Sequence, residues 1–178
     1  FLISPNGSPY SREKIDTRTQ IAIKRSVETN VPIVYLNMTG GQDDLIFDGA
    51  SFVLNPGGKL VVSLPQFEET EEVINFVKVD NAWLVEPGIR SLYDNVVAQD
   101  YRAMVESLKE YTRKSGFSKV ILGLSGGVDS ALVATIATDA MGPKNVLCVR
   151  LPSKFSSQGS LDDAANLVDN LNCLIETI

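Results

Sequence analysis

Histidine is absent from the 178-residue sequence, and cysteine and tryptophan are scarce, with two and one residues respectively. The lack of histidine excludes a Ser-His-Asp triad, a Cys-His dyad, a histidine-ligated zinc ion and a histidine general base. No run of about 18 apolar residues occurs, so we expect no membrane span. Basic residues are also few: 16 Lys and Arg stand against 22 Asp and Glu, and the net charge is −6. This acidic balance argues against a nucleic-acid partner bound through a broad basic face.

The two cysteines, Cys148 and Cys173, have no neighbour at Cys-x-x-Cys spacing, which argues against a metal or redox pair. We expect two buried or half-buried thiols in a reducing compartment. The chain opens with Phe1 and has no charged segment followed by an apolar stretch and a cleavage site. Both ends are strand-like, at residues 1–3 and 174–178, so we expect a fragment of a longer chain.

The first half of the sequence combines apolar runs of strand length with one helical segment, a pattern typical of an α/β fold. We predict a helix over residues 11–30, with Ile15, Ala22, Ile23 and Val27 facing the core. Residues 39–43 read as a flexible turn. The expected strands cover residues 1–4, 31–38, 45–47, 51–54, 60–64 and 73–79, of which those at 45–47, 51–54 and 60–64 form a β-meander.

The middle of the chain reads as a connection between two domains. Residues 68–72 form an acidic run, which we interpret as a solvated face, and residues 81–90 lack helical periodicity. A helix follows, and Gly116 is a suitable residue to end it. Its apolar residues fall on one stripe that we expect in the core: Val97, Tyr101, Met104, Val105, Leu108 and Tyr111.

Two later apolar runs, at residues 119–124 and 145–151, are typical of strands in a parallel sheet. Helices are expected over residues 131–140 and from Ser160 onward, where Asp163 completes a capping-box spacing. This order of elements predicts a βαβα unit with right-handed crossovers: strand, turn, helix, strand, loop and helix.

The segment between the first of these strands and its helix carries the clearest chemical signal. It consists of Gly123, Leu124, Ser125, Gly126, Gly127, Val128, Asp129 and Ser130. A helix N-terminus offers free N–H groups and a positive dipole end to a phosphate, and glycines let the backbone approach it. Ser125 and Ser130 add hydroxyl donors. Asp129 would repel a polyphosphate unless Mg²⁺ lay between them, so we predict that Asp129 binds this metal.

Two familiar phosphate-binding loops do not fit this segment, and a purely structural turn is an alternative to a phosphate site. It is not a Walker A loop, because no Gly-Lys-Ser/Thr follows, and its glycines do not fit Gly-x-Gly-x-x-Gly. An ordinary strand-to-helix turn, with Ser and Asp as helix caps, is the simplest alternative. Asp129 could also act only as a partner of the helix dipole.

The segment Ser125-Gly126-Gly127-Val128-Asp129-Ser130 resembles the SGGxDS loop of N-type ATP pyrophosphatases. Residues 151–157 and 160–164 resemble the loop and helix after the second strand of glutamine-dependent NAD synthetases. Upstream, residues 5–10 and 37–49 resemble the late part of the nitrilase-like glutaminase domain in that family. The order of these segments is specific to the family, and the resemblance is weakest over residues 66–95.

The resemblance implies an α/β fold with two parts. The first is the C-terminal part of a nitrilase-like α-β-β-α sandwich. The second is the first βαβα unit of a parallel-sheet, Rossmann-like domain of the adenine nucleotide alpha hydrolase type. The implied domains are residues 1–80, a linker at 81–95, and residues 96–178. It implies amidation of deamido-NAD to NAD with ATP and with ammonia from glutamine, through an adenylated intermediate. It further implies a cytoplasmic homo-oligomer that binds neither nucleic acid nor membrane.

By position, the resemblance places ATP on residues 123–130, Mg²⁺ on Asp129, and glutamine on Ser8 and Lys14. Ser156 and Ser157 either line the ATP cleft or belong to a capped surface loop. Residues 40–43 either shape the glutamine pocket or form a structural turn. The glutaminase Glu, Lys and Cys of the family have no counterpart here, because no cysteine precedes Cys148. We therefore expect these 178 residues alone to catalyse neither half-reaction.

Two alternative functions remain open. One is a different amidotransferase or thiolating enzyme with an SGGxDS loop, although that group would not carry the upstream segments at residues 6–10 and 40–49. The other is a regulatory module that binds ATP without catalysis.

Overall fold

The computed structural model describes residues 1–152 and 157–178, and Ser156 therefore lies outside the described residues. The chain divides into two compact units, Phe1–Ala103 and Met104–Ile178, and the division falls within helix α2 (Val96–Ser115). Both units combine helices with strands, so the predicted α/β class is confirmed. The domain limits predicted at residues 80 and 95 stay a prediction, because compactness alone does not mark a functional boundary.

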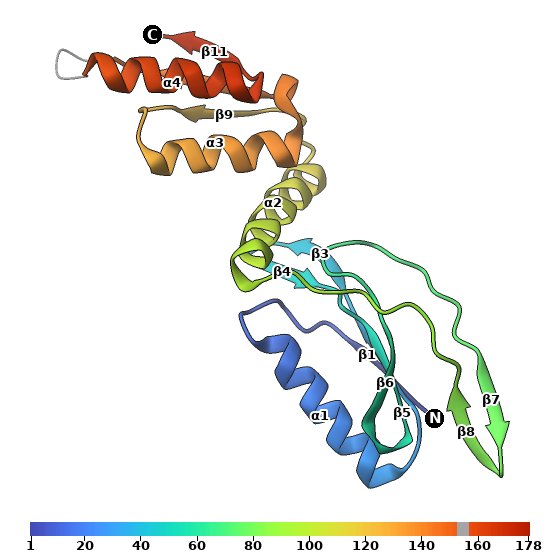
Figure 1. Cartoon of the computed structure of the whole chain (residues 1–178). Helices are drawn as coiled ribbons and strands as arrows, with labels where there is room; N and C mark the ends of the chain where they lie inside the picture. The colour runs from blue at the N-terminus through green and yellow to red at the C-terminus, as the bar shows by residue number, and fades with distance from the viewer. Residues whose placement is uncertain (153–156) are drawn as a thin grey trace. The chain divides into compact units, whose positions relative to one another are not determined.

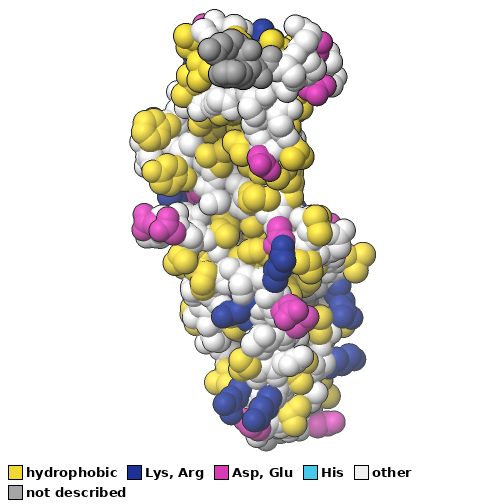
Figure 2. All heavy atoms as spheres, turned by 90° about the vertical axis from the view of Figure 1, so that its left-hand side faces the viewer, with side chains coloured by type: hydrophobic (Ala, Val, Ile, Leu, Met, Phe, Trp, Pro, Cys, Tyr) yellow, Lys and Arg dark blue, Asp and Glu magenta, His cyan; other side chains and the backbone are white. Residues whose placement is uncertain are grey.

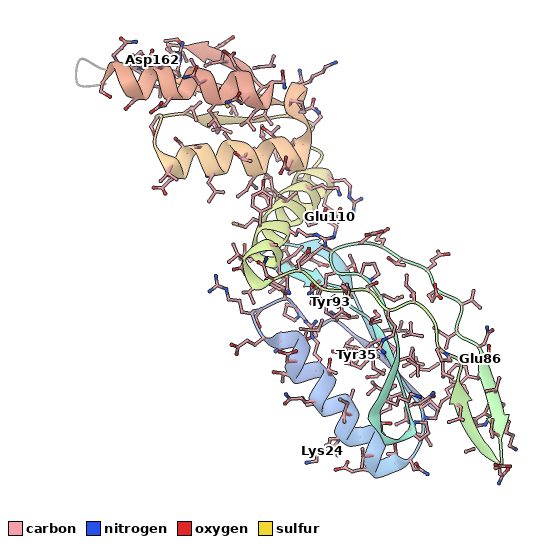
Figure 3. The ribbon with its side chains drawn as sticks, viewed as in Figure 1. Lys24, Tyr35, Glu86, Tyr93, Glu110 and Asp162 are labelled. Carbon is pink, nitrogen blue, oxygen red and sulfur yellow. The ribbon has the colours of Figure 1, made fainter. Side chains whose placement is uncertain are left out.

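The first unit is built on a four-stranded sheet of order β1-β2-β5-β6. Its strands are β1 (Leu2–Asn6), β2 (Ile33–Asn37), β5 (Phe52–Asn55) and β6 (Lys59–Ser63). Strands β1 and β2 are parallel, and α1 (Lys14–Thr29) supplies the crossover that a parallel pair requires. The helix lies along the sheet (Figure 1). Between them Phe52 and Leu54 are buried with Ala22 of α1, and Tyr35, labelled in Figure 3, packs against this cluster.

A β-hairpin formed by β7 (Phe76–Val79) and β8 (Ala82–Val85) adds a second cluster to this unit. Val85 is buried with Val34 and Val53 of the central sheet. Asn55 holds the hairpin, because its side-chain amide donates to the Val85 carbonyl at 2.9 Å and its oxygen accepts from the Val85 N–H at 2.7 Å. The strand expected at residues 73–79 is confirmed in its second half, where β7 lies. Strand β8 was not expected, because it lies in residues 81–90, which we interpreted as a connection between domains.

Two expectations for residues 39–64 were wrong. Residues 39–43 are not a flexible turn: β3 (Thr39–Gln42) pairs with β4 (Leu45–Asp48) in a separate two-stranded sheet. The meander is also absent from the described residues, since β5 and β6 pair with each other but not with β4. Glycines at 40 and 41 suggested a turn, but the bend itself falls at Asp43, whose φ is 50°.

The inner face of α1 is more polar than the expected apolar stripe, of which Ala22 alone is fully buried. Arg18, Ala22 and Ser26 are its buried residues, whereas Ile23 and Val27 are 36% and 58% exposed. Arg18 forms an ion pair with Asp48, in which Nη1 alone lies 2.8 and 3.0 Å from the two carboxylate oxygens. Ser26 donates to the Asn55 carbonyl at 2.8 Å. Apolar periodicity therefore misplaced the buried face because hydrogen bonds compensate for the desolvation of these polar groups.

The second unit is a three-stranded parallel sheet of order β11-β10-β9. Its elements after α2 are β9 (Val120–Gly123), α3 (Val128–Met141), β10 (Val146–Arg150), α4 (Gln158–Leu171) and β11 (Leu174–Thr177). Ala134 of α3 and Val168 of α4 share one buried cluster with Cys148 of the central strand. The predicted βαβα order and parallel pairing are confirmed. Short 3-10 turns occupy Pro56–Gly58 in the first unit and Pro143–Asn145 in the second.

Two helix predictions in this half need correction. The apolar stripe of α2 is core only in part: Val97, Met104 and Tyr111 are 76%, 43% and 56% exposed, whereas Leu108 is half-buried against the cluster of the second unit. Ala103 and Thr112 are its buried residues. The capping box at Ser160 is also wrong, because Ser157 is the N-cap of α4 and its Oγ accepts from the Ser160 N–H at 3.2 Å. Among the described residues, no helix has the length and apolarity needed to cross a membrane.

The ion pair of Arg18 gives a stability prediction. Replacing Arg18 with Met leaves the Asp48 carboxylate, 1% exposed, without its charge partner, and we expect a loss of about 3–5 kcal/mol in the free energy of unfolding. Urea denaturation measures this loss. The matched control is Arg25→Met on the same helix, which breaks an exposed pair with Glu28 and should cost under about 1 kcal/mol. The double variant Arg18→Met/Asp48→Asn should recover part of the loss; equal effects of Arg18→Met and Arg25→Met would contradict the role of burial.

Candidate functional site

The glycine-rich loop lies where β9 passes into α3, at the carboxyl edge of the parallel sheet. Leu124 fixes its start, because this residue is 4% exposed and its N–H donates to the Val149 carbonyl at 2.8 Å. Gly127 is the N-cap of α3, so Val128, Asp129 and Ser130 form the first helical turn. In open α/β sheets, ligands bind at this edge, which is where the sequence placed a phosphate.

Both serine hydroxyls of the loop are engaged within it. The Ser130 hydroxyl donates to the Gly127 carbonyl at 2.9 Å and lies 3.0 Å from the Ser125 hydroxyl. Since the single hydrogen of Ser130 is used in this way, the hydroxyl of Ser125 is the donor between the two serines. Ser125 Oγ in turn accepts from the Gly127 N–H at 3.3 Å. These bonds hold the shape of the loop, and the ligand contacts predicted for the two serines stay a prediction.

The donors left for a ligand are backbone amides. Ala131 is the first residue of α3 whose N–H bonds back to the turn, at 3.0 Å from the Gly127 carbonyl. Among the described residues, the N–H groups of Gly126, Val128, Asp129 and Ser130 have no acceptor. Free amides at a helix N-terminus, with the positive end of the helix dipole behind them, suit an anion such as phosphate.

Asp129 is exposed in the first turn of α3 and has no hydrogen bond or ion pair within the described part of the chain. The described residues contain no group of three or more acidic or sulfur ligands that would hold a metal alone. Mg²⁺ often uses one or two carboxylates together with substrate phosphates and water. One exposed carboxylate beside a row of free amides fits a Mg²⁺ ion that is bound jointly by the protein, substrate phosphates and water.

Gly126 brings the loop against the N-terminus of α4. Its φ is +83°, and a Cβ atom at this position would lie 2.1 Å from the Ser160 carbonyl oxygen. Two helix N-termini therefore meet at the loop, because Ser160 lies in the first turn of α4. Ser157, a candidate from sequence, caps this second helix and belongs to the same edge of the sheet.

Sequence reasoning missed one cation at this edge. Arg150 is the last residue of β10, and its Nε and Nη2 donate to Thr177 Oγ1 at 3.1 and 2.9 Å. Its Nη1 lies 3.4 Å from the Leu161 carbonyl of α4. A lone arginine at the end of an apolar run carries no motif, so only the parallel register reveals its proximity to the first turns of α4.

The second candidate pair, Ser8 and Lys14, lies in the first unit on the wall of one cavity of about 410 Å³. The cavity is bounded by β1, by β2 and by α1, with Arg18 also at its wall. Gly40 to Asp43, the other segment assigned to this region, form β3 and the bend after it and do not line the cavity. The structure thus brings together two residues that the sequence separates by a turn.

Ser8 is held firmly from two sides. Its N–H donates to Asn37 Oδ1 at 2.9 Å, and Arg18 Nη2 donates to its carbonyl at 2.7 Å. Arg18 Nε also donates to Ser8 Oγ at 3.0 Å. Because arginine carries no acceptor, the hydroxyl hydrogen of Ser8 remains available to donate to an acceptor atom of a ligand. A lysine beside such a donor favours a carboxylate or another anionic group.

Charges elsewhere on the surface are mixed. On the face drawn in Figure 2, acidic and basic side chains are interspersed among apolar ones and do not form a continuous basic surface. This distribution agrees with the net charge of −6.

Comparison with known proteins relates the chain to enzymes of NAD synthesis. Residues 100–178 match the NAD synthase family model. The glutamine-dependent NAD(+) synthetase of Rhodobacter capsulatus is 54% identical over 177 residues, which are 99% of this chain and 32% of that protein. A protein of the same name from Synechocystis sp. is 40% identical over 178 residues, which are 100% of this chain and 32% of that protein. The chain thus spans about a third of the length of these relatives.

A solved structure agrees with this relation. The glutamine-dependent NAD+ synthetase from Acinetobacter baumannii, in complex with ADP, has a TM-score of 0.90 and 36% sequence identity, over 98% of this chain and 33% of that chain. The resemblance to glutamine-dependent NAD synthetases that the motifs indicated is therefore confirmed.

The contact at Gly126 gives a prediction for the loop. Gly126→Ala would push a methyl group against the backbone of Ser160 and add a left-handed residue with a side chain, so we expect a loss of about 2–4 kcal/mol in unfolding free energy. Gly127→Ala is the matched control, because its φ is negative and its nearest neighbour, Ser125 Oγ, lies at an ordinary 3.5 Å. Thermal unfolding compares the two, and similar melting temperatures would refute the close approach.

Proposed function

We propose that this chain, related over nearly its whole length to glutamine-dependent NAD(+) synthetases, is part of such an enzyme. In this proposal the second unit carries part of the ATP-binding site, and the first unit carries part of a nitrilase-like glutaminase site. The single observation behind the proposal is the row of free amides at the N-terminus of α3, next to Asp129, in a chain 54% identical to a protein of that name.

The loop suits the first of two chemical steps. The carboxylate of deamido-NAD attacks the α-phosphorus of ATP, a carboxyl–AMP bond forms, and pyrophosphate leaves with the electron pair of the broken P–O bond. The free amides of Gly126 and residues 128–130 stabilise the negative charge that develops on the leaving pyrophosphate. Mg²⁺, when bound, neutralises part of that charge, and Asp129 is the residue that would hold it. Ammonia then attacks the carboxyl carbon, and AMP leaves.

The cavity at Ser8 and Lys14 suits the source of that ammonia. Glutamine carries an α-carboxylate, and Lys14 supplies the opposite charge while the Ser8 hydroxyl supplies a donor. The first unit contains no cysteine, so the thiolate that cleaves the amide in nitrilase-like enzymes must come from residues outside this chain. We therefore expect the isolated 178-residue chain to catalyse neither half-reaction.

The metal role of Asp129 is tested in the full-length enzyme. Asp129→Asn keeps the size of the side chain but removes the charge, and we expect adenylation, measured as exchange of pyrophosphate into ATP, to fall about 100-fold or more. Ammonia release from glutamine should persist. Asp139→Asn, an exposed aspartate near the other end of the same helix, is the control and should retain normal exchange. Normal exchange by Asp129→Asn would overturn the role.

The glutamine site is tested by comparing two nitrogen sources. Ser8→Ala and Lys14→Ala each remove one contact to a charged ligand, so we expect the KM for glutamine to rise about tenfold or more. Synthesis driven by free ammonia should be unchanged, because ammonia bypasses this cavity. Lys24→Ala, another lysine of α1 that does not line the cavity, is the control (Figure 3). Equal losses with glutamine and with ammonia would refute the assignment.

A further inference from the structure

The segment that connects β1 with α1 is anchored by one acidic residue that no motif identified. Tyr10 donates its hydroxyl hydrogen to Asp100 Oδ1 at 2.9 Å. Arg12 donates to Asp100 Oδ2 through Nε at 2.9 Å and through Nη2 at 2.6 Å. Asp100 lies in α2, about 90 residues away in sequence, yet both of its oxygens are used on this segment. Tyr10 and Arg12 stand between Ser8 and Lys14 in the chain.

The electrostatics keep this contact formed at neutral pH. Hydrogen bonds from Arg12 and Tyr10 lower the pKa of Asp100, so this carboxylate is ionised. Burial and the hydrogen bond to Asp100 raise the pKa of Tyr10 to about 12, so its hydroxyl remains a donor. The rings of Tyr10 and Phe67 also pack edge to face, with their centres 5.3 Å apart. The backbone N–H of Tyr10 donates to the Ile46 carbonyl at 2.7 Å.

The start of α1 has few side-chain contacts apart from this one, although the Lys14 N–H donates to the Ser11 carbonyl at 3.1 Å. Glu13 occupies the N-cap position with φ 64°, a strained conformation for a residue with a side chain, and makes no side-chain cap hydrogen bond. Lys14 is the first residue of the helix. Arg18 holds the beginning of the segment, at the Ser8 and Pro9 carbonyls, but its contacts do not reach residues 10–14. Tyr10 and Arg12 thus tie the segment between Ser8 and Lys14 to α2, in addition to the Arg18 contacts that hold α1 against Ser8.

Asp100 is itself well placed to act as an anchor. The neighbouring Arg102 donates to the Gln66 carbonyl at 2.7 Å, and its guanidinium lies 5.6 Å from the centre of the Phe67 ring. Gln66 Nε2 donates to Gln99 Oε1 at 3.3 Å. Residues 99–102 of α2 are therefore bound to the first unit by side chains on both flanks of Asp100.

We propose that Asp100 is a positioning residue for glutamine binding, which sets the spacing between Ser8 and Lys14 through Tyr10 and Arg12. This inference rests on the proposed function of the cavity and adds a residue that touches no substrate. Its role is to keep the two ligand contacts at the separation that the two ends of glutamine require.

The test uses the full-length enzyme and the variant Asp100→Asn, which has one acceptor oxygen in place of two and no charge. We expect the KM for glutamine to rise about five- to tenfold, with the rate of ammonia-driven synthesis unchanged. Asp94→Asn is the matched control, because it removes an exposed ion pair with Arg102 at 3.3 Å without a contact to the segment. Its KM for glutamine should equal that of the unmodified enzyme.

A second variant separates positioning from a general loss of structure. Arg12 is 70% exposed, so Arg12→Met should leave folding intact while it removes the same contact. We expect it to raise the KM for glutamine, and the double variant with Asp100→Asn to be no worse than the more affected single variant. Additive effects, or an unchanged KM in Asp100→Asn, would overturn the inference. An unmodified enzyme that uses ammonia but not glutamine would instead overturn the proposed glutamine site.

Discussion

The buried ion pair between Arg18 and Asp48 joins the parts of the first unit that surround the cavity. A buried ion pair adds little net stability, because removing two charges from water offsets most of their attraction. Its effect here is positional, because the planar guanidinium has donors in a fixed fork and these donors bind two separate segments. One nitrogen binds the end of β4, and the others bind the hydroxyl and carbonyl of Ser8 and the carbonyl of Pro9. Helix α1, strand β4 and the Ser8 turn therefore share one centre.

The two candidate sites rely on different kinds of groups. In the first unit, the proposed glutamine site uses the side chains of Ser8 and Lys14, and its walls are held by residues distant in sequence such as Asn37 and Asp48. In the second unit, the backbone presents the donors, and side chains such as Ser125 and Ser130 support the loop from within. Side-chain sites are sensitive to the position of each anchoring residue, whereas a backbone site is sensitive to glycines that permit its path.

Much of the second unit could be predicted from sequence because its signals are local. The runs at residues 119–124 and 145–151, and the glycines between them, predicted a parallel pair and a phosphate loop. The first unit was harder. Arg18 and Asp48 are 30 residues apart, and periodicity that assumes an apolar interior assigns Arg18 to solvent. Asp100 meets Tyr10 across an even longer separation, and no local pattern marks either partner. Ser157 was missed as a cap because Ser160 offered a similar spacing.

The hydrogen-bonded serine pair of the phosphate loop affects the thermodynamics of ligand capture. A loop that orders its amide groups only when the ligand binds loses conformational entropy in the binding step. Here Ser125 and Ser130 close the ring through bonds within the loop, so part of that entropy is lost during folding. In the proposed ATP site a phosphate would therefore meet a preorganised surface, and the entropic penalty of its binding would fall mainly on the nucleotide and its hydration shell.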